Sequence, residues 1–195
     1  MQRSTVIKRP LMLVAFDPGM KNLGVWAGSD PEHTSKLGKF CIKKEGVPLY
    51  EAAVKLLSSY RWMSDPALIS EAVVETQAPR NVPARIVATA IYAFLKGRGV
   101  SVRFSGSRMK DSAVRFYGNK LGVKVADKPS SASGRYRVNK RNSESVARAL
   151  LGDAILGRFT KLDDVCDAAM LGAGLHLEKT GGAAHSDPKK ENTSN

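Results

Sequence analysis

Cysteine is scarce in this chain, and so are acidic residues and long apolar runs. The two cysteines, Cys41 and Cys166, are too few for a disulfide framework and are expected to be reduced core thiols of an intracellular protein. No apolar run approaches the roughly 20 residues that span a bilayer, which argues against a membrane protein. Residues 1–16 combine basic side chains with a short apolar run, which favours a first strand over a signal peptide.

The shortage of acidic residues leaves a large positive charge. The chain has 31 Lys and Arg against 18 Asp and Glu, a net charge of +13 and a pI near 9.9. This balance is typical of nucleic-acid-binding proteins, although ribosomal and membrane-surface proteins share it. Residues 96–148 hold 14 Lys and Arg against the three acids Asp111, Asp127 and Glu144, a net +11. This concentration favours a polyanion that follows one face of the fold.

The apolar pattern predicts an α/β domain. Five strands are expected, at residues 11–16, 23–27, 37–42, 67–75 and 100–104. Helices are expected between and after them, at residues 49–60, 81–96 and 108–118. The expected architecture is a mixed sheet whose first three strands are antiparallel, with helices on both faces. The domain is predicted to span residues 1–177, and residues 178–195 to form a disordered polar tail.

The pattern weakens toward the carboxyl end. Residues 127–138 are rich in Ser, Gly and Arg and are interpreted as a loop. Asn142 is the predicted N-cap of a helix that ends near residue 156. Either Asp163 or Asp164 is predicted to cap the last helix of the domain.

Two acidic residues, Asp17 and Glu75, each close an apolar strand. If these strands are parallel neighbours, both carboxylates lie at the same carboxyl edge of the sheet, where functional groups collect in α/β folds. Like charges that close together are usually held by a divalent metal, and Mg²⁺ or Mn²⁺ prefers oxygen ligands. The pattern therefore indicates a metal site at this edge.

A second acidic pair, Asp164 and Asp167, shares one face of the last predicted helix. Asp167 stands among small apolar residues, where an unpaired carboxylate would be costly to bury and a metal would remove the cost. Taken singly, each acid has a simpler interpretation: Asp17 as a turn residue, Glu75 as a surface charge, Asp164 as a cap. Their joint occurrence favours the metal site. The remaining acids, Asp111, Asp127 and Asp153, lack a strand-end setting.

Three segments resemble, in order, the acidic motifs of RuvC-type Holliday junction resolvases of the RNase H-like superfamily. They are AFDPGMKNLGVW at 15–26, VVETQAPRN at 73–81 and KLDDVCDAAMLG at 161–172. Lys21-Asn22 and Gln77 look closest to the poxvirus and large DNA virus branch. The resemblance implies symmetric cleavage of four-way DNA junctions by a homodimer. It also implies two Mg²⁺ or Mn²⁺ ions per active site, on Asp17, Glu75, Asp164 and Asp167.

The resemblance also implies lysines near the scissile phosphate. One corresponds to Lys110, and another to Lys140 or Arg141, all of which would also contact DNA. Further DNA contacts are predicted at Lys21 and in the basic segment Arg135, Tyr136 and Arg137, where the tyrosine could stack on bases. The helix at 81–96 carries an apolar stripe of Ile86, Ala90 and Phe94, which would form the dimer interface or pack on the sheet.

Two other functions fit the same residues. An RNase H-type nuclease that acts on RNA–DNA hybrids or other branched DNA would use the same four acids. A non-catalytic basic nucleic-acid-binding module would explain the charge but not the acids.

Overall fold

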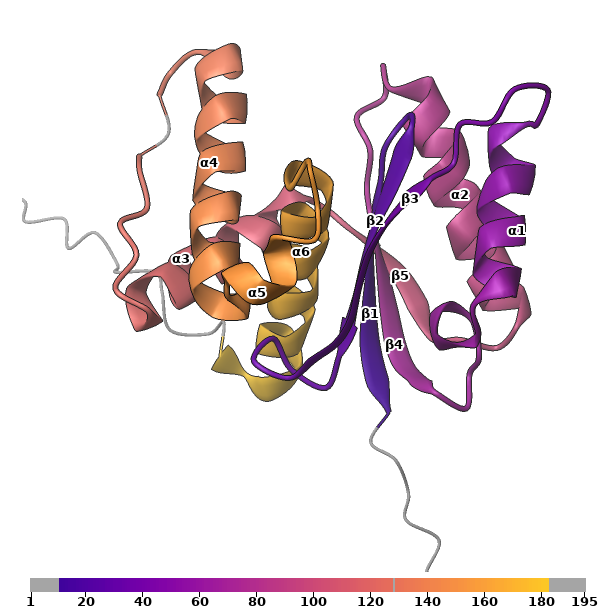
Figure 1. The fold of residues 1–195 in the computed structure, drawn as a ribbon, viewed down its shortest axis with the longest axis horizontal. Coiled ribbons are helices and arrows are strands. Elements are labelled where there is room, and N and C mark those ends of the chain that lie inside the picture. The colour runs from indigo at the N-terminus through magenta and orange to yellow at the C-terminus, as the bar shows by residue number, and fades with distance from the viewer. Residues whose placement is uncertain (1–10, 128, 183–195) are drawn as a thin grey trace, which may run out of the picture.

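A five-stranded mixed sheet forms the centre of the protein, seen in a computed structural model that describes residues 11–127 and 129–182 (Figure 1). Its strands are β1 (Met12–Pro18), β2 (Asn22–Gly28), β3 (Thr34–Cys41), β4 (Ile69–Glu75) and β5 (Val102–Ser105). In the order β3-β2-β1-β4-β5, the first three strands along the chain pair antiparallel, and β1–β4 and β4–β5 pair parallel. The predicted mixed sheet is confirmed.

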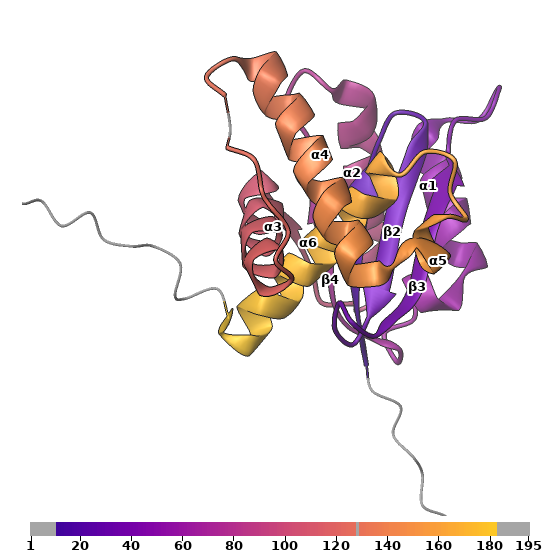
Figure 2. The same ribbon diagram turned by 60° about the vertical axis from the view of Figure 1, so that its left-hand side comes forward.

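Helices cover both faces of the sheet, as the pattern predicted (Figures 1 and 2). On one face lie α1 (Leu49–Ser59), the short 3-10 helix η1 (Arg61–Met63) and α2 (Val82–Gly97). On the other lie α3 (Ser107–Lys120), α4 (Ala132–Leu151), α5 (Asp153–Leu156) and α6 (Asp163–Thr180). Within the described ranges, no helix is both long and apolar enough to cross a membrane.

Two apolar cores form because successive side chains of a strand point to opposite faces of the sheet. Leu13 and Ala15 of β1 face the core built with α3, α4 and α6. Val14 and Phe16 face the core built with α1 and α2. The same alternation points Asp17, two residues after Ala15, toward α6 rather than toward α2.

Helix α6 lies closer to the sheet than side chains of ordinary size would permit. A Cβ placed on Gly24 of β2 would lie 2.1 Å from the carbonyl oxygen of Asp164, and one on Gly172 would lie 2.1 Å from the Trp26 ring. Both glycines thus remove the side chain that would hold helix and strand apart. The close approach brings the acidic first turns of α6 to the carboxyl end of β1.

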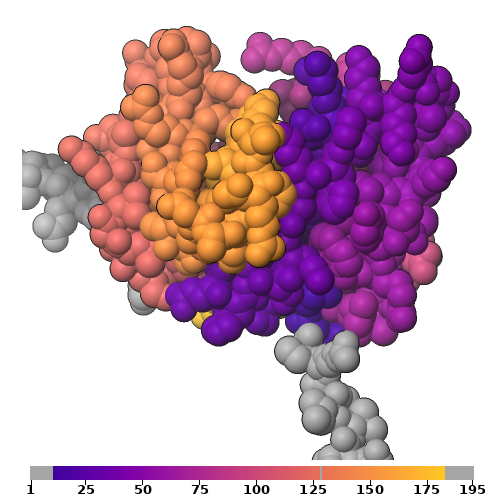
Figure 3. Space-filling view, in the orientation of Figure 1, coloured from indigo at the N-terminus to yellow at the C-terminus, as the bar shows by residue number. Residues whose placement is uncertain are grey.

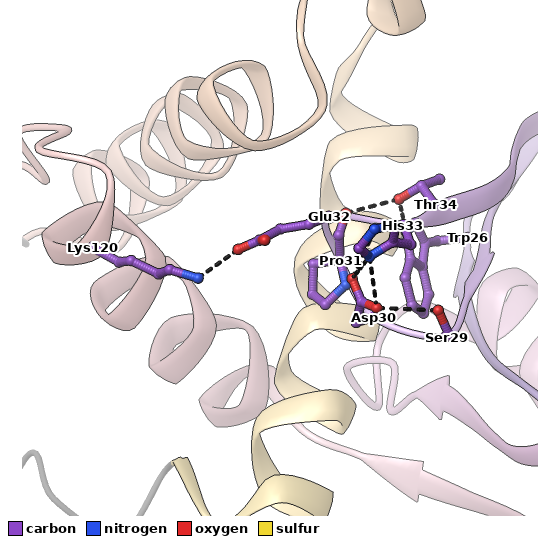
Figure 4. A network of polar contacts seen from close by, with 8 residues as sticks. All are labelled: Trp26, Ser29, Asp30, Pro31, Glu32, His33, Thr34 and Lys120. Atoms are coloured by element: carbon purple, nitrogen blue, oxygen red, sulfur yellow. Dashed lines mark hydrogen bonds and ion pairs between the residues drawn. The ribbon is translucent and has the colours of Figure 1, made fainter.

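The β2–β3 turn is braced against the second helical layer (Figure 4). The Trp26 indole donates to Thr34 Oγ1 at 2.8 Å, and that hydroxyl donates to the Pro31 carbonyl at 3.0 Å. Glu32, in the same turn, forms an ion pair of 2.5 Å with Lys120 of α3. These contacts hold the hairpin that carries one wall of the site described below.

The carboxyl-terminal third departs from the sequence-based expectation. The predicted loop at 127–138 is wrong, because α4 begins at Ala132, with Ser131 Oγ accepting from the Gly134 amide as its N-cap. Asn142 is therefore not an N-cap but a buried residue within α4, whose side chain bonds the Ala126 backbone amide and carbonyl. The helix was missed because few of its residues are apolar and only a narrow stripe of it is buried.

The last helix and the cysteines also differ in detail. The N-cap of α6 is Leu162, and both Asp163 and Asp164 lie inside its first turn, where the helix dipole favours acidic side chains. The helix continues to Thr180, beyond the predicted end at residue 177, and the rest of the predicted tail, 183–195, lies outside the described residues. Cys166 is buried as expected, but Cys41 is exposed, so only one thiol belongs to the core.

Candidate active site

Parallel pairing of β1 with β4 brings two carboxylates together. Phe16 pairs with Val74, so the next residues, Asp17 and Glu75, end adjacent strands at one edge of the sheet. Both are almost completely buried, with exposed fractions of 8% and 9%. Their side chains are hydrogen-bonded to each other. The strand-end geometry predicted from the sequence is therefore what the structure contains.

A third buried carboxylate and two lysines complete the cluster. Asp167 of α6 is 5% exposed, and Lys110 from the first turn of α3 lies between it and β4. The Lys110 ammonium is 2.7 Å from Glu75 Oε1 and 3.4 Å from Asp167 Oδ2. Lys140 of α4 forms a second, short ion pair with Asp167. Asp17, Glu75, Asp167, Lys110 and Lys140 are called the carboxylate–lysine cluster below.

Burial and mutual contact set the charges of Asp17 and Glu75. Burial raises the pKa of Asp17 well above its usual range, more than the attraction of Lys110 lowers it, and the neighbouring Glu75 raises it further. Burial also disfavours ionised Glu75, but the hydrogen bond from Asp17 and the charge of Lys110 outweigh it, so the pKa of Glu75 is lowered. The two acids share one site, and their pKa values are accordingly displaced in opposite directions, that of Asp17 upward and that of Glu75 downward.

The lysines and Asp167 remain fully charged. Burial opposes the charge on Lys110, but Asp17, Asp167 and Glu75 together raise its pKa. The pKa of Lys140 is raised in the same way, against burial, by Asp167. Burial likewise opposes ionised Asp167, yet Lys110, Lys140 and a hydrogen bond from Ser143 hold its pKa below the usual range. The two ammonium groups are the counter-ions of this buried acidic cluster.

Asp164 lies at the rim and outside this cluster. Its Oδ2 accepts from the Asn22 amide at 3.3 Å and lies 3.7 Å from the Lys39 ammonium of β3. The side chain is 18% exposed, against 7% for Asp167. Asp163, one residue earlier, pairs with Lys161 at 3.4 Å. Neither acid donates or accepts as a helix cap.

The cluster lies in a cleft of about 490 Å³ at the carboxyl end of the sheet. Its lining comes from β1, β2, β4, α3, α4 and α6 and from the loops beside them. The space-filling view shows a notch between α4 and the loops of the sheet (Figure 3). All four predicted acids line it, as do Lys21, Gln77, Asn81, Lys110, Tyr136 and Lys140. Asp111, which the sequence argument set aside, lines it as well, because it is carried on the same turn of α3 as Lys110.

The predicted DNA-contacting residues divide into two groups. Of the two candidates Lys140 and Arg141, Lys140 points into the cluster, whereas Arg141 does not line the cleft. Tyr136, on the turn of α4 before Lys140, is 62% exposed at the cleft, with the ammonium 5.9 Å from its ring centre. Arg135 and Arg137 are exposed on α4 outside the lining.

Several residues of the site were not foreseen. Ser143 and Asn139 line the cleft from α4, on the same helical face as Tyr136 and Lys140. The spacing 136, 139, 140, 143 is that of one helix face, so a correct assignment of α4 would have revealed them. Lys39 and Asn22, the partners of Asp164, come from the β2–β3 hairpin and carry no such local pattern.

The donor chemistry of the cleft fits a hard divalent cation. Asp17, Glu75, Asp164 and Asp167 offer carboxylate oxygens, the ligands of Mg²⁺ and Mn²⁺. The ammonium groups of Lys110 and Lys140 supply positive charge among these oxygens. In this arrangement, no three acidic, His or Cys side chains of the described ranges are grouped to hold one ion. Metal binding would therefore require a shift of Lys110 away from Glu75 and Asp167.

The comparisons with known proteins identify the fold. No protein-family model matches the sequence, and no curated protein sequence does. Solved structures do match. T. thermophilus RuvC in complex with Holliday junction substrate has a TM-score of 0.53 at 13% identity, and a second structure of Thermus thermophilus RuvC has 0.54 at 14%. Each match covers 88% of this chain and 97% of the RuvC chain.

A yeast protein structure also matches the fold of this chain. The yeast mitochondrial Holliday junction resolvase Ydc2 matches with a TM-score of 0.50 at 13% identity, over 92% of this chain and 88% of its own. These neighbours lend no support to the resemblance with the viral branch. At such low identity it is the fold that the likeness establishes, and the chain has the RNase H-like fold of RuvC and Ydc2.

Proposed function

We propose that the protein is a structure-specific endonuclease that resolves four-way DNA junctions. The observation that carries the proposal is the convergence of Asp17, Glu75 and Asp167 with Lys110 and Lys140 at one sheet edge. Three carboxylates that are each less than 10% exposed carry a large desolvation cost, which structural stability alone does not explain. Of the solved structures with this fold, one is named a Holliday junction resolvase and another is bound to a Holliday junction substrate.

The acids would hold two Mg²⁺ or Mn²⁺ ions. Asp17 on β1, Glu75 on β4 and Asp167 on α6 would hold them, and Asp164 would contribute from the rim. When bound, such ions activate a water as nucleophile and stabilise the leaving 3′ oxygen of the phosphodiester. Because carboxylate ligands bind metals in the ionised form, the raised pKa of Asp17 would oppose metal binding as pH falls.

The lysines would act on the phosphate. Lys110 and Lys140 are ammonium ions already oriented into the cleft by Glu75 and Asp167. Once these carboxylates are engaged elsewhere, the ammonium groups are free to donate to the non-bridging oxygens of the scissile phosphate, where negative charge increases in the transition state. Asn81 and Asn139 also have side-chain oxygens that are buried without a partner among the described residues. Both asparagines line the same cleft.

A homodimer is part of the proposal, with its interface on α1 and α2. Two residues of the predicted stripe, Ala90 and Phe94, pack partly against the core between the helices and the sheet, as the alternative interpretation has it. All three stripe residues also line an open apolar groove between the two helices, where Ile86 is 43% exposed, and this groove is the proposed interface. A four-way junction has approximate two-fold symmetry, which a two-fold dimer of this chain would match.

Cleavage of defined substrates tests the function. A synthetic four-way junction, a linear duplex and an RNA–DNA hybrid are incubated with Mg²⁺, Mn²⁺ or EDTA. We expect paired, symmetric nicks in the junction with metal, none with EDTA, and none with Asp17→Asn or Glu75→Gln. Preferred cleavage of the hybrid would indicate an RNase H-type enzyme instead. Binding without any cleavage that depends on Asp17 would indicate a non-catalytic module.

The dimer is tested separately, by sedimentation equilibrium of the wild type and of Ile86→Glu. We expect the wild type to be dimeric and the variant monomeric, because a charge in the groove would be desolvated on association. Lys55→Glu, on an exposed position of α1 outside the groove, is the matched control. A monomeric wild type at micromolar concentration would contradict this part of the proposal.

A further inference from the structure

The cleft itself contributes little charge with which to attract DNA. Asp17, Glu75 and Asp167 are opposed there by the ammonium groups of Lys110 and Lys140. Three buried carboxylates thus stand against two ammonium groups, so the cluster has no excess positive charge. At the rim, Asp163 and Asp164 are likewise opposed by Lys161 and Lys39. Binding of a polyanion must therefore depend on cations that flank the cleft.

The basic stretch at 96–148 supplies only part of that charge. Its Arg103 pairs with Glu71 and Glu178, and its Arg148 pairs with Glu144 and Asp153. Lys120 is paired with Glu32 (Figure 4). These three cations belong to ion pairs outside the cleft lining. Exposed cations of this stretch next to cleft-lining residues include Arg135 and Arg137 on α4 and Arg108 at the start of α3.

The opposite side of the cleft carries three further lysines, which the sequence did not group together. Strand β3 runs in the same direction as β1, since each is antiparallel to β2 between them. Lys43 and Lys44 follow the end of β3, so they stand at the same sheet edge as Asp17 and Glu75. Lys21 is in the turn that joins β1 to β2 at this edge and lines the cleft. Lys21, Lys43 and Lys44 are called the hairpin patch.

Backbone hydrogen bonds fix the two segments of the hairpin patch to each other. The amides of Ile42 and Lys43 both donate to the carbonyl of Lys21, at 2.9 and 3.3 Å, which joins the two segments just beyond the β2–β3 ladder. Ile42 is 1% exposed and anchors the segment in the core. Lys21, Lys43 and Lys44 are all exposed, and none pairs with a carboxylate of the residues that the structure describes. The three ammonium groups are therefore available to an external anion.

The position of the hairpin patch fits double-stranded DNA. Adjacent strands are about 4.8 Å apart, so the end of β3 lies roughly 10 Å from the end of β1. Duplex DNA carries one phosphate charge per roughly 1.7 Å of axis, so several phosphates fall within that distance. A duplex whose scissile phosphate enters the cleft would extend over α4 on one side and over the hairpin patch on the other.

We infer that the hairpin patch is a second duplex-binding surface, which holds the DNA arm on the side of the cleft opposite α4. The inference rests on the proposed function for its choice of substrate. Lys43 and Lys44 contact phosphates and carry no sequence information. They contribute affinity that depends steeply on salt concentration, because each neutralised phosphate releases condensed counter-ions.

The test measures binding rather than cleavage. Affinities for a fluorescent 25-base-pair duplex and for a four-way junction are measured by anisotropy in EDTA, across a range of KCl concentrations. The variants are the full chain with Lys43→Ala and Lys44→Ala together, and a control with Lys36→Ala and Lys96→Ala. The control removes the same charge from exposed positions at the other end of β3 and at the end of α2 distant from the cleft. Thermal unfolding verifies that both variants fold.

The logarithm of the association constant falls linearly with the logarithm of the salt concentration, by roughly 0.9 for each phosphate contact. We therefore expect the Lys43/Lys44 variant to have a slope about 1.8 less steep than that of the wild type. The corresponding loss of affinity near 0.1 M salt is on the order of tens-fold. The control is expected to retain the wild-type slope. A Lys43/Lys44 slope equal to that of the control overturns the inference.

The same experiment separates this inference from the proposed function. If the wild type cleaves junctions but the slopes of both variants are equal, only the inference fails. If the slope falls as expected but the wild type cleaves nothing with Mg²⁺ or Mn²⁺, the patch is confirmed and the endonuclease proposal fails. If the wild type binds neither DNA, both fail.

Discussion

Removal of the Lys110 ammonium should destabilise the protein strongly in the absence of metal. Lys110 is 13% exposed and lies 2.7 Å from Glu75 and 3.4 Å from Asp167, which are 12% and 7% exposed. Lys110→Met keeps the length and packing of the aliphatic stem while it removes the charge. Because the variant leaves buried carboxylates without their shared counter-ion, we expect a loss of about 3–5 kcal/mol in the free energy of unfolding.

The assay is urea denaturation at pH 7.5 in EDTA. For a domain of this size, the expected loss corresponds to a fall in Tm of roughly 6–20 °C. Lys161→Met is the matched control, since Lys161 also pairs with an aspartate of α6 but is 64% exposed. It should change stability by less than about 1 kcal/mol. Addition of Glu75→Gln to Lys110→Met should restore part of the loss, because it removes one of the uncompensated charges.

The loss of stability caused by Lys110→Met should depend on pH. The pKa values of Glu75 and Asp167 are lowered in the folded state, partly by Lys110, so their stabilisation is present at neutral pH and is lost as pH falls through the folded values. The cost of Lys110→Met should accordingly shrink toward pH 4. A variant within 1 kcal/mol of the wild type at pH 7.5 in EDTA would falsify the assignment of Lys110 as the counter-ion of the cluster.

Three further predictions follow from single contacts. Asp17→Asn should stabilise the metal-free protein by roughly 1 kcal/mol or more at pH 8 and little at pH 4. Because the pKa of Asp17 is raised in the folded state, the Asp17 side chain favours folding at pH values below its ordinary pKa, and this contribution is lost as pH rises. Equal effects of Asp17→Asn at both pH values in thermal scans would contradict this prediction. Gly24→Ala should cost about 1–3 kcal/mol, because its Cβ would meet the Asp164 carbonyl at 2.1 Å. Gly97→Ala, with nothing within 4 Å, should cost nothing measurable by urea denaturation. Tyr136→Ala should weaken junction binding by about 1–3 kcal/mol without loss of stability if the ring stacks on bases, whereas Tyr136→Phe should bind normally. Equal anisotropy titrations for all three proteins would exclude stacking.

Much of the fold was predictable because it depends on local patterns. Apolar runs that end in Asp17 or Glu75 predict strands that end in acids, and the order of strands and helices then restricts the topology to a few mixed sheets. The long connection between β1 and β4 permits their parallel pairing, which the sequence left as a condition and the structure shows. The helical conformation of residues 132–138 was not predicted, because a polar helix with a narrow buried stripe has no apolar periodicity to detect.

The sequence by itself determined which carboxylates stand at strand ends, where the excess positive charge lies along the chain, and which small residues allow a helix to approach a sheet. Tertiary structure alone decided how these residues combine. It placed Asp167 inside the carboxylate–lysine cluster and Asp164 at its rim, it turned Lys140 rather than Arg141 toward the cleft, and it brought Lys43 beside the turn that carries Lys21. These outcomes depend on the rotation of α4, the depth at which α6 packs and the direction of β3. Each is fixed by contacts between segments far apart in the chain, which no local pattern records.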